Sequence, residues 1–232
     1  MTPKTNTTKA LIFDSGTLIS FSMNGMLDVV EKLKEVFPGK FLITTEVRKE
    51  VVDTPLNIKK FELEALKIKS LIDTGVLEFP SSLGITDSEI ENEDNQILNV
   101  ANSTFSGKGK DIHLLDHGEA SCLALSKILT KRGVNNIIAI DERTMRLLIE
   151  RSENLRRIME SRLNIKISVK NQNLPMFKDF KIVRSTELAY VAYKKGLLDL
   201  KGGLVLDAIL YALKFKGAAI SGEEIEEIKK LG

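Results

Sequence analysis

Two carboxylates that follow unbroken apolar segments are the first candidates for chemistry in this chain. Asp14 ends the run Leu-Ile-Phe-Asp, and Asp141 ends the run Ile-Ile-Ala-Ile-Asp. A short apolar run bounded by turn-forming residues is typical of a strand that is buried on both faces, and open α/β sheets bind ligands beyond the carboxyl ends of such strands. On two parallel strands of one sheet, these carboxylates would share an edge and repel each other unless a cation lay between them. The pair therefore predicts a site for a hard divalent cation.

Three further acids are candidates for the same site. Glu50 lies one turn into a helix that is predicted to stop at Pro55, beside apolar residues, and it fits a solvent-facing position equally well. Asp116 and Glu119 open another predicted helix, where a capping arrangement alone would account for both residues. The same alternative applies to Asp14, because an aspartate directly after a strand also suits the N-cap of the next helix.

Four residues are candidates for binding a polyanionic substrate. Arg143 lies two residues after the second strand-ending aspartate, in the first turn of an arginine-rich helix predicted over 142–160. The glutamates interleaved in that helix favour a solvated, ion-paired face for its other arginines. Lys108 and Lys110 lie in a Gly-Ser-Lys segment that reads as a surface loop within reach of a phosphate, and Ser15 directly follows the first aspartate.

The elements that must position these residues alternate along the chain. Apolar runs predict strands, and apolar residues at helical spacing predict the helices between them. This alternation predicts an α/β fold, a three-layer α/β/α arrangement around a central parallel sheet. We expect an α/β domain over 9–170 and a helical extension over 171–232 that packs on the same core. The predicted strands end near residue 14 and span 41–43, 76–79, 136–141 and 165–169; the main predicted helices span 24–36, 58–74, 87–101, 142–160, 186–197 and 203–215.

Composition narrows the function classes. The 34 basic and 32 acidic residues give a net charge of +2, so nucleic acid would have to bind a local patch and not a global basic field. The single cysteine, Cys122, excludes an internal disulfide and a zinc site built on several thiolates, and it suits a reducing cytoplasm. No apolar run approaches the length of a membrane span, and the first residues lack the pattern of a signal peptide. We therefore expect a cytoplasmic protein without a membrane partner.

The acidic segments together resemble the four motifs of the PIN domain family, in the family's order. They are Leu-Ile-Phe-Asp14-Ser-Gly-Thr-Leu-Ile, Thr-Thr-Glu-Val-Arg-Lys-Glu50-Val, Leu-Asp116-His-Gly-Glu119-Ala and Ile-Ile-Ala-Ile-Asp141-Glu-Arg. The resemblance covers about residues 9–169 and implies a metal-dependent ribonuclease with a parallel sheet of order 3-2-1-4-5. It further implies that Asp14, Glu50, Glu119 and Asp141 bind Mg²⁺ or Mn²⁺ and position the attacking water, with Asp116 as an additional candidate ligand. The Gly-Glu-Ala form and the C-terminal helices resemble a prokaryotic subgroup of the family.

Two other functions stay open from the sequence. Many active members of the family carry Thr or Ser two residues before the last aspartate and an acid two residues after it, where this chain has Ala139 and Arg143. That departure keeps open a catalytically inactive PIN-like scaffold that binds RNA or a protein. The segment Asp14-Ser-Gly-Thr also resembles the nucleophile loop of haloacid dehalogenase phosphatases, but Gly16 replaces the second aspartate of that loop. Single-stranded or structured RNA is the expected partner, and a homodimer or a protein partner is a further expectation.

Overall fold

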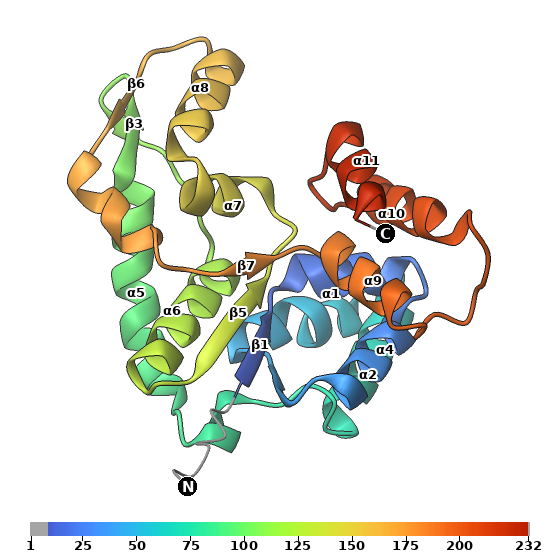
Figure 1. Ribbon diagram of the computed structural model, residues 1–232. Coiled ribbons are helices and arrows are strands. Elements are labelled where there is room, and N and C mark those ends of the chain that lie inside the picture. The colour runs from blue at the N-terminus through green and yellow to red at the C-terminus, as the bar shows by residue number, and fades with distance from the viewer. Residues whose placement is uncertain (1–8, 232) are drawn as a thin grey trace, which may run out of the picture.

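A four-stranded parallel sheet lies at the centre of the computed structural model, which describes residues 9–231 (Figure 1). Its strand order is β2-β1-β5-β7, and the register pairs Phe13 at the end of β1 with Ala139 at the end of β5. The two central strands end level with each other because their apolar runs are buried on both faces. The strands of this sheet are β1 (Lys9–Phe13), β2 (Gly39–Leu42), β5 (Asn135–Ala139) and β7 (Ile182–Val183).

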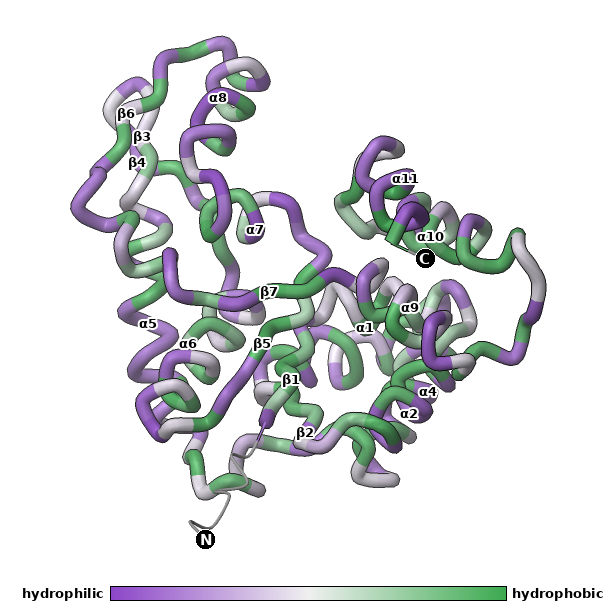
Figure 2. The backbone as a smooth tube through the Cα atoms, in the orientation of Figure 1, coloured by the Kyte–Doolittle hydropathy of each residue, from purple (hydrophilic) through white to green (hydrophobic). Residues whose placement is uncertain are grey.

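Helices cover both sides of this sheet, so the chain has the mixed α/β architecture that the sequence predicts. Helix α6 lies against β1 and β5, with α5 packed on it, whereas α1, α2, α4 and α9 gather on the other side in Figure 1. The apolar segments in Figure 2 concentrate on the inner strands and on the helix faces turned toward them. The helices up to β5 are α1 (Ser15–Met23), α2 (Leu27–Val36), α3 (Thr45–Arg48), the π-helical turn η1 (Lys49–Asp53), the 3₁₀ turns η2 (Pro55–Asn57) and η3 (Pro80–Leu83), α4 (Glu62–Asp73), α5 (Asp87–Thr104) and α6 (His117–Lys131).

The prediction of a fifth parallel strand over 165–169 is wrong. Residues Ile167–Val169 form β6, which pairs antiparallel with β3 (Phe105–Gly107) in a separate small sheet of order β4-β3-β6, and β7 takes the place beside β5. Strand β6 is buried at one residue and exposed at the next, which suits a sheet with one wet face. The expected loop around Lys108 and Lys110 is also a hairpin: β4 (Lys110–Asp111) follows a turn in which Lys108 and Gly109 both have positive φ, as a type I′ turn requires.

Three more segments differ from expectation. The predicted strand over 76–79 is reduced to one parallel bridge between Leu42 and Glu78. The predicted helix over 142–160 is two helices, α7 (Arg143–Glu150) and α8 (Ser152–Leu163), because Arg151 between them has a non-helical φ of −150° and ψ of 62°. Helix α1 was not expected and begins directly after Asp14.

The C-terminal part contributes to both the sheet and the helical layers. Strand β7 lies beyond residue 170, after the 3₁₀ segment η4 (Asn171–Phe177), and α9 (Ser185–Lys194) contacts α1 and α2. Helices α10 (Val205–Phe215) and α11 (Gly222–Lys230) share a small apolar cluster of their own. Asp207, the lone acid of α10, forms a 2.6 Å ion pair with Lys229 of α11. None of the helices between residues 9 and 231 is long and apolar enough to cross a membrane.

Candidate acidic site at the carboxyl edge of the sheet

Asp14 is buried at the carboxyl end of β1. Its side chain is 2% exposed, and its backbone N–H donates to the carbonyl of Ala139 at 3.0 Å, which continues the β1–β5 ladder. The residue also caps α1, since its Oδ2 accepts a hydrogen bond from the N–H of Gly16 at 3.1 Å. The N–H of Ser15 is directed at the same carboxylate. Its Oδ1 is buried and has no hydrogen-bond partner, so capping uses only half of this carboxylate.

Asp141 lies two residues beyond β5 and is equally buried, at 2% exposure. Its Oδ1 accepts a hydrogen bond from the N–H of Ser185 at 2.8 Å, and its Oδ2 is buried without a partner. Gly16 separates the two aspartates: a Cβ on this glycine would lie 3.3 Å from Oδ2 of Asp14 and 3.9 Å from Cβ of Asp141. The structure therefore brings these two carboxylates together, each with one oxygen left over.

Glu50 and Glu119 approach this pair from two other elements. Glu50 lies in η1, and its carboxylate is in contact with Gly118 at the start of α6; a Cβ on Gly118 would lie 2.3 Å and 2.6 Å from its two oxygens. The missing side chain of Gly118 is therefore what leaves room for Glu50. Glu119, the next residue of α6, accepts a hydrogen bond from the backbone N–H of Asp116 at 3.0 Å, as in a capping box.

The electrostatics of these four acids are coupled. Burial raises the pKa of Asp14 from 3.8 to about 7; the N–H of Gly16 opposes the rise, and the charges of Glu50 and Asp141 add to it. Burial likewise raises the pKa of Glu119 from 4.5 to about 8, and the charge of Asp14 contributes. Burial and mutual repulsion therefore disfavour the charged form of these carboxyl groups in the metal-free protein, and a bound cation would favour it.

The other predicted site residues lie outside this cluster. The carboxylate of Asp116 is exposed and contacts Nε2 of His113 at 2.8 Å. Arg143 is exposed at the first position of α7, close in sequence to the strand-ending aspartate. Lys108 and Lys110 are exposed at the β3–β4 turn, in the small sheet and not in the parallel one.

Asp94 of α5 is a buried acid that was not among the predicted site residues. It is 3% exposed, and its Oδ2 lies 2.6 Å from Nδ1 of His117, the first residue of α6. Burial raises the pKa of Asp94, whereas hydrogen bonding to Asp94 raises the pKa of His117. The helical spacing from Ile90 through Asp94 to Ile97 places this acid on the buried face of α5, and that signal could have identified it from the sequence.

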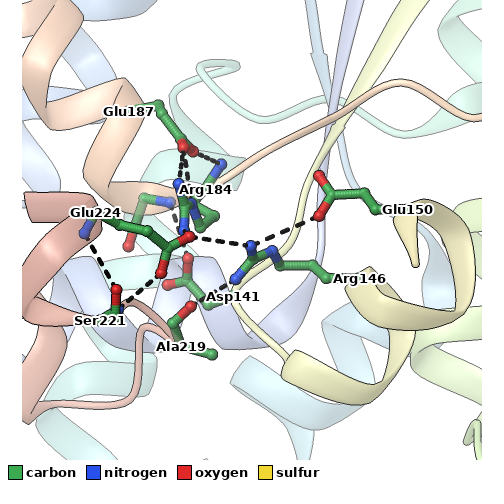
Figure 3. A network of polar contacts seen from close by, with 9 residues as sticks. Asp141, Arg146, Glu150, Arg184, Glu187, Ala219, Ser221 and Glu224 are labelled. Atoms are coloured by element: carbon green, nitrogen blue, oxygen red, sulfur yellow. Dashed lines mark hydrogen bonds and ion pairs between the residues drawn. The ribbon is translucent and has the colours of Figure 1, made fainter. Parts of the chain in front are cut away.

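A network of arginines and glutamates beside Asp141 was also missed (Figure 3). Arg184 hydrogen-bonds Glu187, and it pairs with Glu224 of α11 at 2.7 Å. Although burial raises the pKa of Glu224, the N–H of Ser221 and the charge of Arg184 lower it to about 2. The network therefore fastens α11 to the start of α9, next to the buried aspartate. The network joins residues far apart in the sequence, so no local sequence pattern indicates it.

Arg146 of α7 makes the second half of this network. It hydrogen-bonds the carbonyl of Ala219 and lies 3.7 Å from Glu150 and 3.9 Å from Glu224. The N–H of Ala219 in turn donates to the backbone carbonyl of Asp141 at 3.2 Å. The segment before α11 is thereby attached to the end of the β5 strand.

The donor set of the acidic site fits a hard divalent cation. Carboxylate oxygens are the preferred ligands of Mg²⁺ and Mn²⁺, and Asp14 and Asp141 each offer a buried oxygen without a partner. Between residues 9 and 231, however, no three His, Cys, Asp or Glu side chains already stand in the geometry of a metal site. Glu50 in η1 and Glu119 in the first turn of α6 have long side chains, so rotation about their side-chain bonds would have to complete the coordination.

Comparisons with protein-family models, with curated proteins and with solved structures found no match. The assignment of a function therefore depends on the geometry and charge of the acidic site.

Proposed function

We propose that this protein is a PIN-like endoribonuclease that hydrolyses RNA phosphodiester bonds with Mg²⁺ or Mn²⁺ bound at the acidic site. One observation carries the proposal: Asp14 and Asp141 are buried at the ends of adjacent parallel strands, and each keeps an oxygen without a partner. Burying two carboxylates side by side is unfavourable in the metal-free protein. Each aspartate accepts one backbone N–H at the start of a helix, α1 or α9, and this contact uses only one of its two oxygens. A function that requires both charges would account for the two oxygens that remain.

The architecture supports the resemblance to PIN domains. The sheet order β2-β1-β5-β7 is compatible with the order 3-2-1-4-5, which we infer by counting the single bridge at Glu78 as a further strand beside β2. The helices on the two sides of the sheet correspond to the outer layers of a three-layer α/β/α fold. In such open sheets the crossover points at the carboxyl edge are the usual places for a ligand, and the two aspartates lie at that edge.

The four acids have different roles in this proposal. Asp14 and Asp141 would hold the cation through their unpaired oxygens, and Glu50 and Glu119 would complete its coordination. A divalent cation held by carboxylates lowers the pKa of a bound water and neutralises charge that develops on the phosphodiester. Glu119, with a pKa of about 8, holds a proton in much of the metal-free population near neutral pH. Arg143 at the rim would bind the phosphate.

The test combines cleavage with metal binding. Wild-type protein should cleave a labelled single-stranded RNA of mixed sequence in Mn²⁺ or Mg²⁺ and not in EDTA, and Mn²⁺ should raise its melting temperature. Asp141→Asn should lose both effects while it still accepts the hydrogen bond from Ser185. The matched control is Asp111→Asn, which removes an exposed aspartate of the small sheet.

The result that contradicts the proposal is equally specific. If Mn²⁺ neither raises the melting temperature nor supports cleavage by the wild type, the catalytic function is wrong. RNA binding or protein binding that persists under those conditions would then favour the inactive PIN-like scaffold.

A further inference from the structure

Two adjoining hollows lead away from the acidic site between α7–α8 and α10–α11. The inner hollow, of about 490 Å³, has Asp141 in its lining, and the outer hollow has a volume of about 810 Å³. They share lining residues, among them Arg143 and Ala219, so they form one continuous groove. Figure 1 shows α10 and α11 facing α7 across this space. The groove is therefore a route from solvent to Asp141.

The α7–α8 wall of this groove carries cations that the chain does not neutralise. Arg143 and Arg151 line the outer hollow, are exposed, and form no ion pair with any residue of the described chain. Arg162, which lines the inner hollow, is likewise without an ion pair among residues 9–231. Arg156 of the same helical segment lies outside both linings and pairs with Glu153. Arg157 also lines the outer hollow but pairs with Glu153 at 3.7 Å. The expected ion-paired face is therefore present in part, and Arg143, Arg151 and Arg162 are its exceptions.

The opposite wall carries two unpaired carboxylates, beside Lys214 of α10. Glu223 and Glu227 of α11 line the outer hollow, are exposed, and form no ion pair within residues 9–231. They are four residues apart, so they lie on one face of the helix. The groove thus offers guanidinium groups on one side and carboxylates on the other.

We propose, on the basis of the ribonuclease function above, that this groove binds single-stranded RNA with its phosphates on Arg143 and Arg151 and its base edges toward Glu223 and Glu227. Arginine binds phosphate oxygens in a bidentate manner, which suits the basic wall. Carboxylates accept hydrogen bonds from exocyclic amino groups such as N4 of cytosine, which uracil lacks. A duplex hides these edges from the groove, because sequence-specific contacts to RNA require unstacked bases. The groove therefore selects single strands and prefers cytosine to uracil.

Binding without metal tests the proposal separately from catalysis. Fluorescence anisotropy in EDTA would compare twelve-nucleotide oligo(C), oligo(U) and a duplex of equal length. We expect oligo(C) to bind about tenfold more tightly than oligo(U), since one good base contact discriminates by about 1–3 kcal/mol. The double variant Arg143→Gln/Arg151→Gln should bind every single strand more weakly and lower the slope of log affinity against log salt by about 1.4, or about 0.7 per phosphate contact. The control Arg156→Gln removes one arginine outside the groove and should keep the wild-type slope.

The acidic wall has its own readout. Glu223→Ala/Glu227→Ala should bring the affinities for oligo(C) and oligo(U) within about twofold of each other without weakening the binding of oligo(U), because it removes the base contact and leaves the phosphate contacts. Melting temperatures of all variants would establish that they are folded.

Three outcomes would overturn the proposal. Unchanged RNA affinity in the arginine variant means that the arginines of the groove do not bind the phosphates of RNA. Equal affinity of the wild type for oligo(C) and oligo(U) means that Glu223 and Glu227 do not contact the base edges. Binding of poly-glutamate, and not RNA, by the same arginines makes the groove a protein-docking surface. If the wild type shows no Mn²⁺-dependent cleavage but binds RNA through these arginines, the ribonuclease function is wrong and the assignment of the groove to RNA remains.

Discussion

Replacing Asp14 by asparagine should stabilise the metal-free protein at alkaline pH. The pKa of Asp14 is about 7 in the folded chain against 3.8 as its usual value, because the carboxyl is buried and faces other acids. Between these values the native state holds a proton that the unfolded state has released. Unfolding then releases a proton, so the stability that this proton provides is complete below pH 3.8 and is lost as the pH rises to about 7. A difference of about three pKa units corresponds to roughly 4 kcal/mol of unfolding free energy.

Asparagine does not ionise, but its carbonyl oxygen can still accept the hydrogen bond from Gly16. The variant should therefore match the wild type near pH 4 and exceed it by about 2–4 kcal/mol above about pH 8. For a chain of this size, that gain corresponds to a rise in melting temperature of roughly 5–15 °C. Mn²⁺ should reverse the order, since the wild type gains stability from the metal and the variant lacks the ligand.

Urea unfolding in EDTA at a series of pH values measures the difference directly, with Asp28→Asn as a control for an exposed aspartate that is paired within α2. We expect the difference in unfolding free energy between the variant and the wild type to grow with pH and then level off. If Asp14 acts only as a helix cap, asparagine should cap α1 equally well, and the variant should match the wild type at every pH. That outcome would refute the burial of an uncompensated charge at this site.

Three further predictions follow from the same contacts. Gly118→Ala should place a methyl group 2.3 Å from Oε1 of Glu50 and displace that carboxylate. Because alanine favours the helix by up to about 1 kcal/mol, the melting temperature should not fall, whereas Mn²⁺-dependent cleavage should decrease. Unchanged cleavage would contradict the role of Glu50. Mn²⁺ affinity measured by calorimetry should rise from about pH 6 to about pH 9, because the metal competes with a proton on Glu119, whose pKa is about 8; Glu119→Gln should flatten this profile. Arg184→Gln should lower the free energy of unfolding by about 1–2 kcal/mol at neutral pH. In the wild type the ionised Glu224 contributes stability that is present above pH 4.5 and is lost as the pH falls toward 2. The variant should lose less stability over this pH range, and an unchanged acid transition would argue against the Arg184–Glu224 pair.

The central part of the fold was predictable because its signals are local. The apolar runs before Asp14 and Asp141 are long enough to identify β1 and β5, and their burial on both faces implies parallel pairing. The capping box at the start of α5 is a signal of the same kind, since Thr86 and Glu89 interact within one helical turn. Local chemistry of this kind does not depend on which distant segments pack nearby.

The edge of the sheet was not predictable in the same way. Strand β7 has two residues, Ile182 and Val183, between a lysine and an arginine, so it carries almost no hydrophobic pattern of its own. The segment 165–169 has a stronger pattern and was therefore chosen as the fifth strand. Pairing with β5 is decided by the path of the chain after α8, which no short window records.

The candidate site was likewise predictable only where its signals are local. The acids were chosen from their places at strand and helix ends, which the sequence indicates. The contact of Glu50 with Gly118 and the burial of Asp94 against His117 each join elements distant in the chain. Such contacts depend on tertiary packing, and only a structure can supply them.

The arginines near Asp141 give the strongest physical reason for a mobile cation at this site. Arg184 and Arg146 lie beside this aspartate in Figure 3, yet their hydrogen bonds and ion pairs go to Glu187, Glu224 and the carbonyl of Ala219. Burial and the charge of Arg184 lower the pKa of Arg146, so this part of the protein already holds cations under strain. Had either guanidinium turned to the free oxygen of Asp141, a permanent ion pair would have neutralised the carboxylate and removed it from metal chemistry. The surrounding glutamates keep both arginines occupied, which leaves the unpaired oxygen of Asp141 available to the proposed cation.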